Sequence, residues 1–157
     1  MAEELILGLD FGTSSVKGIF IDFEGSILKR VESKIETKHS LGTHAEQNAL
    51  DYLVPLKDIS SKNSDLISRV VSIGLSGQTP SVVCADKDGQ PVRPVLIWQD
   101  NRAVAEATEL DKRFGNPLQV IGTSLPWSAS ACPAKLLWLS RNEEQTVAKT
   151  KWIFQPK

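Results

Sequence analysis

The chain of 157 residues is 41% hydrophobic and 24% charged, as expected for one globular domain that buries a substantial core. A formal net charge of −1 gives no long-range attraction to nucleic acid or to an anionic membrane, and no apolar run approaches the ~20 residues of a membrane span. The acidic start, Met-Ala-Glu-Glu, has the wrong charge for a signal peptide. Because Cys84 and Cys132 are isolated and only two histidines are present, we expect a reduced, cytoplasmic protein without a zinc site.

The first apolar segment, Leu5–Leu9, leads into Asp10, and a second apolar segment follows at Ile19–Ile21. Between them lie a glycine, three hydroxylated residues and a lysine. This pattern predicts a buried strand, a tight polar turn and a second strand that runs back along the first. The spacing is not that of a P-loop, in which four residues separate a glycine from Gly-Lys-Ser/Thr.

The polar turn contains the residue types that a phosphate site uses. Gly12 lets the backbone approach a ligand closely, and successive N–H groups in such a turn can form a concavity that binds an anion. Thr13, Ser14 and Lys17 add donors. Asp10 at the strand end can hold Mg²⁺ through water, because this ion favours one or two carboxylates together with phosphate oxygens. On these residues alone, a phosphate-binding hairpin and an ordinary hairpin with a solvated tip are equally good interpretations.

A third strand is predicted at 27–31, and the polar stretch 33–47, which holds both histidines, is predicted to be a loop. Asn48 can cap a helix whose apolar positions are Leu50, Leu53, Val54 and Leu56. Pro55 lies too deep for a first turn and should kink or shorten this helix, which the polar stretch 60–64 then breaks before a short helical piece at 66–67. A second apolar strand, 70–78, ends in a polar glycine turn, as the first strand does.

In the second half of the chain, 81–85 and 92–98 flank an acidic glycine turn and predict a hairpin. Pro91 and Pro94 confine at least one of its strands to a sheet edge. One face of a helix that stops before Gly115 is formed by Ala103, Ala107, Leu110 and Phe114. The remaining predicted elements are a helical turn after Asn116, a helix from Pro133 to near Asn142, a helix starting at Glu143–Glu144 and a strand at 151–154.

A second group of polar residues, Trp98 to Arg102, follows an apolar strand and precedes a helix, where sites form in α/β sheets. A sugar site calls for this mixture of an aromatic face, a carboxylate and an arginine. An equally good interpretation is that Trp98 belongs to the core and that Asp100 pairs with Arg102 or caps the helix. Gln78 at the end of the other strand points to the same edge if the two strands are neighbours.

These segments together resemble the FGGY carbohydrate kinases, a family that includes xylulose, glycerol and gluconate kinases. The resemblance spans nearly the whole chain and rests on four motifs: Leu-Gly-Leu-Asp10-Phe-Gly12-Thr13-Ser14-Ser-Val-Lys17, Ile-Gly-Leu-Ser-Gly77-Gln78, Pro-Val-Leu-Ile-Trp98-Gln-Asp100-Asn-Arg102 and Pro133-Ala-Lys135-Leu-Leu-Trp138-Leu. The first motif is shared with the wider actin-like and Hsp70-like ATPases. The motif at Trp98 is more specific to the sugar kinases.

The resemblance implies an α/β fold, a ribonuclease H-like domain of the actin-like ATPase superfamily with a mixed central sheet and flanking helices. It also implies ATP-dependent phosphorylation of a sugar or polyol hydroxyl with Mg²⁺ as cofactor. Asp10 would act in the magnesium–phosphate region, and the residues around the terminal phosphates would be Gly12, Thr13, Ser14 and Lys17. The substrate cleft would be lined by Gln78, Thr79, Pro80, Trp98, Asp100 and Arg102.

Two departures from the family pattern stand out. After Gln78, family members usually carry polar or charged substrate contacts, whereas this chain has Thr79 and Pro80, and a proline side chain forms no hydrogen bond. In addition, the family has about 500 residues in two domains, and its general-base aspartate, second phosphate motif and adenosine site would all follow residue 157. We therefore expect 1–157 to be a truncated N-terminal domain without its own catalytic residue, whose partners are the missing C-terminal domain and a sugar.

By this interpretation the chain alone binds MgATP weakly and does not turn over, because a few charge-assisted hydrogen bonds of ~1.5–3 kcal/mol must offset the cost of ordering. We also expect exposed apolar surface to favour self-association, for example as a homodimer. Two alternatives differ in class. One is a nucleotide-dependent regulator or chaperone-like ATPase of the same superfamily; the other is a ribonuclease H-like nuclease with Asp10 and Asp100 as metal ligands, which the absence of a basic face disfavours.

Overall fold

The computed structural model describes residues 3–156, which divide into two compact units. The first unit contains 3–37, 48–78 and residue 156, and the second contains 38–47 and 79–155. The chain therefore leaves the first unit twice. In the described part of the chain, no helix is both long enough and apolar enough to span a membrane.

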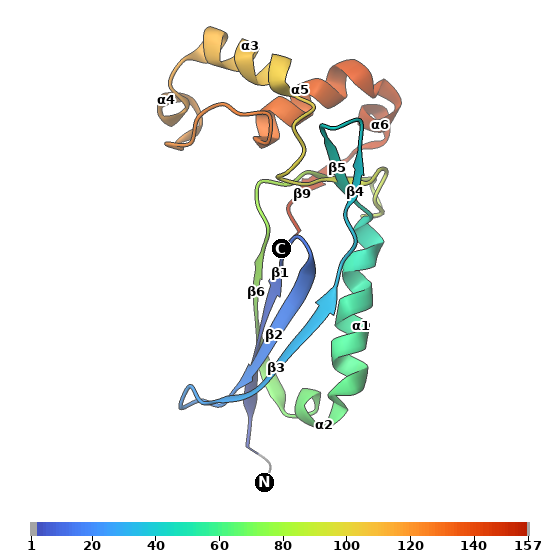
Figure 1. Cartoon of the computed structure of the whole chain (residues 1–157), viewed down its shortest axis with the longest axis vertical. Coiled ribbons are helices and arrows are strands. Elements are labelled where there is room, and N and C mark those ends of the chain that lie inside the picture. Colours follow the sequence, from blue (N-terminus) through green and yellow to red (C-terminus); the bar gives the residue numbers. More distant parts are fainter. Residues whose placement is uncertain (1–2, 157) are drawn as a thin grey trace. The chain divides into compact units, whose positions relative to one another are not determined.

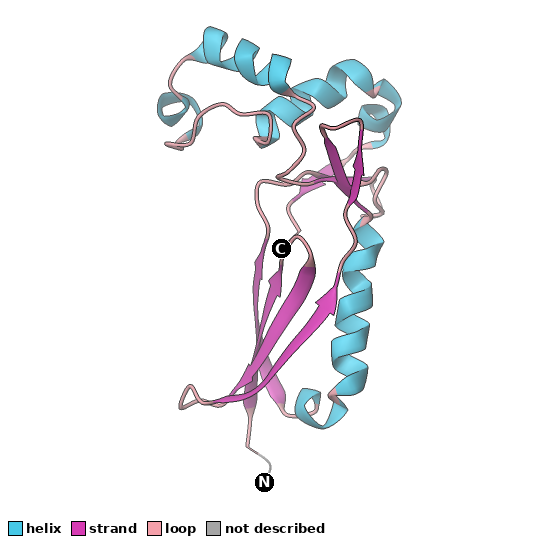
Figure 2. Ribbon diagram, in the orientation of Figure 1, coloured by secondary structure: helices cyan, strands magenta, loops and turns pink. Residues whose placement is uncertain are grey.

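The first unit is built on a four-stranded mixed sheet with the order β3-β2-β1-β6 (Figure 2). Its strands are β1 (Leu5–Phe11), β2 (Ser15–Ile21), β3 (Ile27–Lys34) and β6 (Val70–Gly77). The first three strands pair antiparallel in chain order, and β6 pairs parallel with β1. The predicted strands and the mixed sheet are thus confirmed, and the parallel pairing brings the ends of β1 and β6 together.

One face of this sheet is covered by a helical segment, seen in Figure 1 beside β3. A 3₁₀ turn, η1 (Ala49–Tyr52), leads into α1 (Leu53–Lys62), and α2 (Ser64–Ile67) follows. Alternate residues of β1 point to the covered face and are buried: Leu5, Leu7, Leu9 and Phe11. As predicted, Asn48 caps the segment by accepting a hydrogen bond from the Leu50 N–H at 3.2 Å.

Two details of the helix prediction are wrong. The apolar positions Leu50, Leu53 and Val54 are exposed, and the buried residues lie instead at Tyr52, Pro55, Ile59 and Asn63. The cause is the 3₁₀ turn that precedes α1. Because the α-helix begins only at Leu53, the residues that face the sheet differ from those expected for one continuous α-helix. Pro55 consequently lies in the first turn of α1, where its missing N–H costs nothing, and the helix runs on through 60–62.

The second unit contains two small sheets. One has the order β4-β5-β8, formed by β4 (Lys38–Ser40), β5 (His44–Gln47) and β8 (Val95–Leu96); the other pairs β7 (Val83–Ala85) with β9 (Trp152–Phe154). The predicted loop at 33–47 is therefore wrong. Its hairpin turns at Leu41 and Gly42, both with positive φ, and only Ala45 and Gln47 of its strands are buried, so the apolar alternation that signals a strand is weak.

The predicted hairpin between 81 and 98 is present, although its strands also pair with other segments. Val82 and Leu96 exchange both backbone hydrogen bonds, at 2.9 and 3.1 Å, and the Asp86 N–H donates to the Gln90 carbonyl across the turn. The helices of this unit fall where they are predicted: α3 (Val104–Phe114), α4 (Pro117–Ile121), α5 (Cys132–Asn142) and α6 (Glu144–Lys149). Helix α3 packs on α5 through Ala103, Ala107 and Ala134, whose small side chains allow close contact.

Candidate functional site

The polar turn of the first unit joins β1 to β2 and spans residues 12–14. The Gly12 N–H donates to the Ser15 carbonyl at 3.0 Å, which closes the turn. A Cβ atom at Gly12 would lie 3.0 Å from that same carbonyl oxygen and 4.0 Å from Asp10 Oδ2. Only glycine therefore fits here without a shift of the backbone, so the tightness of the turn depends on Gly12.

Residues from other parts of the first unit hold the turn in place. The Thr13 hydroxyl donates to Gln78 Oε1 at 3.3 Å, and Gln78 Nε2 donates to the Tyr52 hydroxyl oxygen at 3.0 Å. The carbonyl oxygens of the turn accept bonds from Thr37 Oγ1 and the Ile35 N–H, at 3.3 and 2.9 Å. Because these carbonyls are engaged by the protein, they repel an approaching anion less.

Tyr52 forms the buried end of this arrangement. Burial raises the pKa of Tyr52 to about 12, although its hydrogen bond with Gln78 acts in the opposite direction. The hydroxyl therefore stays protonated and neutral at physiological pH. Its ring also meets that of Phe11 edge to face, with 6.4 Å between the centroids, so Gln78 is held between the strand end and the helical segment.

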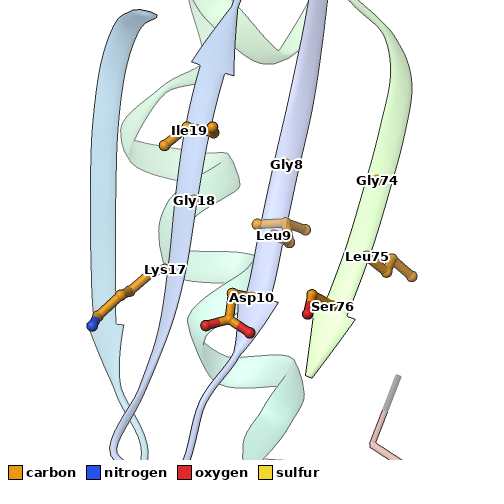
Figure 3. Close-up of a pocket in the computed structure, with 9 residues that line it drawn as sticks. All are labelled: Gly8, Leu9, Asp10, Lys17, Gly18, Ile19, Gly74, Leu75 and Ser76. Carbon is orange, nitrogen blue, oxygen red and sulfur yellow. The ribbon is translucent and has the colours of Figure 1, made fainter. Parts of the chain in front are cut away.

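A shallow depression lies on the sheet face formed by β2, β1 and β6 (Figure 3). Asp10 lies near the end of β1, with Lys17 and Ser76 as its partners on the neighbouring strands. Figure 3 shows the Asp10 and Ser76 side chains near each other, while Lys17 extends away. The floor holds glycines, including Gly8 and Gly74, which pair across the parallel ladder. An exposed carboxylate therefore lies beside a tight turn, at the rim of an open surface.

The second group of predicted site residues lies in the second unit and differs in burial. Trp98 is 44% exposed, whereas the Asp100 side chain is fully buried and that of Arg102 is 4% exposed. Asp100 Oδ2 accepts from the Ala45 N–H at 2.8 Å and from Arg102 Nη2 at 2.8 Å, and its Oδ1 accepts from Arg102 Nε at 2.9 Å. Of the two structural roles offered for Asp100, pairing with Arg102 is observed, whereas the N-cap of α3 is Ala103. The core position offered for Trp98 is not observed.

This ion pair belongs to a larger buried network. Arg102 Nη2 also donates to Glu46 Oε1 at 2.6 Å, and Arg93 Nη2 donates to the same oxygen at 2.7 Å. The Arg102 guanidinium lies over the Trp138 ring, 4.9 Å from its centroid. Burial alone would raise the pKa of Asp100, but the bonds from Arg102 and Ala45 more than offset it and hold this pKa below its usual value. The carboxylate is thus ionised and engaged on both oxygens.

Thr79 and Pro80 begin the longer segment of the second unit, directly after Gln78, and are joined by a cis peptide bond. The Pro80 carbonyl accepts a hydrogen bond from Lys135 Nζ at 3.2 Å, and the Ile97 carbonyl accepts one from the same atom at 2.7 Å. A helix of this unit therefore contacts the backbone on both predicted substrate segments.

Comparison with known proteins gives a consistent result. The chain matches the profile of the FGGY family of carbohydrate kinases, N-terminal domain, over residues 5–157. The chain belongs to this family. A xylulose kinase of Lactococcus lactis subsp. lactis is 33% identical over 158 residues, which cover 97% of this chain and 31% of the relative, and one of Bacillus subtilis is 26% identical, again over 97% and 31%.

Solved structures agree with this FGGY assignment. The structure described as a xyloylose kinase from Brucella ovis has a TM-score of 0.89 at 26% identity, over 98% of this chain and 33% of that one. A gluconate kinase from Lactobacillus acidophilus, at 20% identity, also has a TM-score of 0.89 over 99% and 32%, which shows the shared fold. The actin-like ATPase fold expected from the sequence is therefore confirmed. The FGGY chain spans about a third of the length of the relatives it matches.

The predicted site residues of this FGGY chain fall into two sets, one in each unit. The first unit holds Asp10, Gly12, Thr13, Ser14, Lys17 and Gln78, and the second holds Thr79, Pro80, Trp98, Asp100 and Arg102. Within the first unit, Gln78 contacts the turn directly. Sequence reasoning missed Tyr52, Glu46 and the role of Lys135, although Lys135 lies in one of the four motifs. A lysine among apolar helix positions was the available signal.

Proposed function

We propose that this chain is the N-terminal part of a kinase that transfers the terminal phosphoryl group of ATP to a hydroxyl of a sugar or polyol. The observation that carries the proposal is the hydrogen bond between Thr13 and Gln78. It joins two motifs 65 positions apart, each at the end of its own strand, so that the residues expected at the phosphates adjoin the first residue expected at the substrate. Membership of the FGGY family supports the same reaction class.

On the phosphate side, Gly12, Thr13 and Ser14 would bind the terminal phosphates through the turn, and Lys17 would add positive charge. The donor set beside the turn, one exposed carboxylate and several hydroxyl groups, fits Mg²⁺ that keeps most of its water. Asp10 would hold that water. A bound magnesium ion supplies positive charge that offsets the charge developing on the transferred group. The close approach of phosphate depends on Gly12, since a Cβ atom there would displace the turn.

On the substrate side, Gln78 and Thr79 would supply hydrogen-bonding groups, and the exposed Trp98 would offer an aromatic face to the C–H side of a sugar. Pro80 would contribute shape alone. Asp100 and Arg102 would line the cleft as an intact ion pair that supports its wall. A direct bond from a sugar to either residue would have to replace a bond within the pair. Xylulose is the first substrate to test, since xylulose kinases are among the relatives.

The general base, the second phosphate motif and the adenosine site would come from a C-terminal domain, with 1–157 serving as the N-terminal domain. The whole enzyme would work in the cytoplasm, a location that the free thiols of Cys84 and Cys132 favour. Neither nucleic acid nor membrane is a partner in this proposal. Self-association as a homodimer would involve apolar side chains exposed on β6, Val71, Ile73 and Leu75.

The test is a coupled assay of ADP release by the full-length protein, with MgATP and xylulose, glycerol or gluconate in turn. We expect release that depends on one of these compounds and that disappears without Mg²⁺, and we expect none from the 157-residue chain. Sugar-independent hydrolysis stimulated by unfolded peptide would instead favour a chaperone-like ATPase. Failure of every sugar and polyol would overturn the proposal.

A further inference from the structure

Lys135 is a charged residue in the interior of the second unit. It lies on α5 and its side chain is fully buried, in a helix whose other buried residues are Ala134 and Leu139. Burying an ammonium group is costly unless it is bonded, and an apolar residue of the same volume could fill the space at lower cost. A buried lysine in this position therefore needs a reason beyond packing.

The two bonds of Lys135 suggest that reason. Nζ donates to the carbonyl of Ile97 at 2.7 Å and to that of Pro80 at 3.2 Å. Ile97 directly precedes Trp98, and Pro80 directly follows Thr79. The two acceptors therefore belong to the two segments that we expect to contact the substrate, and they are 17 positions apart in the sequence. One side-chain atom links the two segments.

The backbone of Pro80 can contribute only an acceptor to this link. Val82 and Leu96 exchange both hydrogen bonds of an antiparallel pair, and in that register Pro80 would lie opposite Trp98. Pro80 has no N–H, so it cannot donate to the strand opposite. The ammonium group of Lys135 binds the carbonyls of Pro80 and Ile97, which lie just beyond the Val82–Leu96 pair. The Lys135 side chain thereby links the Pro80 segment to the Ile97 segment through hydrogen bonds.

The charges around Lys135 are consistent with an ammonium group that stays in place. Burial lowers the pKa of Lys135 from 10.5 to about 8, with Cys132 and Asp100 opposing that shift and Arg102 adding to it. In most molecules the Lys135 amine is therefore protonated at neutral pH. A protonated donor forms stronger hydrogen bonds to the two carbonyl oxygens than a neutral amine does.

We propose that Lys135 is a positioning residue for sugar binding, which fixes the backbone of Pro80 and Ile97 and so sets the placement of Thr79 and Trp98. This inference rests on the proposed function. Lys135 does not touch the substrate, since its side chain is buried. Its loss should therefore weaken sugar binding and leave ATP binding nearly unchanged, because the residues expected at the phosphates lie in the first unit.

The experiment measures KM for the sugar and for ATP in the full-length protein, for wild type, Lys135→Met and Lys135→Arg. Methionine keeps most of the volume and removes the donors, whereas arginine restores them. We expect Lys135→Met to raise the sugar KM about tenfold, as loss of charged hydrogen bonds implies, with the ATP KM within about twofold of wild type. Lys135→Arg should recover most of that loss.

Leu110→Ala is the matched control, because Leu110 packs on the cluster that joins α3 to α5 and has no side-chain hydrogen-bonding group. It should lower the melting temperature and leave the sugar KM unchanged. If Lys135→Met fails to fold, Lys135→Gln replaces it, with an expected sugar KM above that of Lys135→Arg. A sugar KM that stays within twofold in Lys135→Met or Lys135→Gln, or an ATP KM that rises equally, overturns the inference. A wild-type protein that phosphorylates no sugar overturns the proposed function, and the role of Lys135 falls with it.

Discussion

The polar turn at 12–14 and the segment from Trp98 to Arg102 look alike in sequence and differ in structure. Each follows an apolar strand and has an aspartate and a basic residue close by in the sequence, Asp10 and Lys17 in the first case and Asp100 and Arg102 in the second. In the first, Asp10 is exposed and the residues that fix the turn are neutral, namely Thr13, Gln78 and Tyr52. In the second, Asp100 is fully buried and Arg102 supplies most of its bonds.

The difference shows that a charged residue in a motif can be exposed at the surface or engaged by the scaffold. A carboxylate whose two oxygens both accept bonds from the protein has little capacity to bind a ligand. Replacing those bonds would remove the interactions that offset the desolvation of the buried ion pair. An exposed carboxylate held by its strand has its oxygens accessible. Substitutions should therefore damage stability at Asp100 and Arg102, and activity at Asp10.

Arg102→Met should have the largest effect, a loss of about 3–5 kcal/mol in the free energy of unfolding. The substitution leaves the buried carboxylate of Asp100 without its guanidinium partner and removes one of the two arginines on Glu46. Urea denaturation followed by circular dichroism measures the change. Arg113→Met, at an exposed arginine of the same unit, is the control and should stay within about 0.5 kcal/mol of wild type. Equal stability of the two variants would contradict a scaffold role for the Asp100–Arg102 pair.

Asp10→Asn should act on the reaction and hardly on the fold. We expect kcat of the full-length protein to fall by about 10²–10³, the range found when a group that stabilises transition-state charge is removed. The melting temperature should change little because the side chain is exposed. Asp65→Asn, at an exposed aspartate of α2, is the control for kcat. A large drop in stability without a drop in kcat would place Asp10 with the scaffold instead.

The sheet and most helices could be predicted because their signals are local. Leu5–Leu9 and 70–78 are apolar runs that end in polar turns, and Gly115 and Pro133 mark helix ends. The hairpin at 38–47 was missed because its strands are short and polar and are stabilised by pairing with β8. The buried face of α1 was missed because a 3₁₀ turn changes the helical phase before Leu53.

The candidate site could be predicted as a set of residues, but not as an arrangement. The motif pattern identified Thr13 and Gln78 separately, and only the parallel pairing of β1 with β6 brings them into contact. Burial decided the interpretation of Asp100, and no residue near it in the sequence reveals the bond from the Ala45 N–H, 55 positions away. Long-range partners of this kind leave no periodic signal.

The charge on Lys135 gives a pH-dependent effect on the scaffold of the second unit. Because its pKa is depressed from 10.5 to about 8, the unfolded chain binds more protons than the folded chain between these values, and the free energy of unfolding rises with pH across that window. The gain should reach at most ~3 kcal/mol. We expect the difference between wild type and Lys135→Met to grow in favour of wild type from pH 8 to 10.5. A difference independent of pH would mean that the buried side chain keeps its ordinary pKa.

Thr13→Val should have the smallest effect of the four and tests whether the turn needs its neutral bonds. The substitution keeps the shape and removes the hydroxyl that donates to Gln78, a bond of about 1 kcal/mol. We expect the ATP KM of the full-length protein to rise about fivefold. Thr108→Val, which removes a hydroxyl bonded to the Val104 carbonyl on α3, should leave it unchanged. If Thr13→Val raised the sugar KM alone, the bond would serve to orient Gln78 toward the substrate, and the turn would hold its shape through Gly12 and the backbone bonds of Ile35 and Ser15.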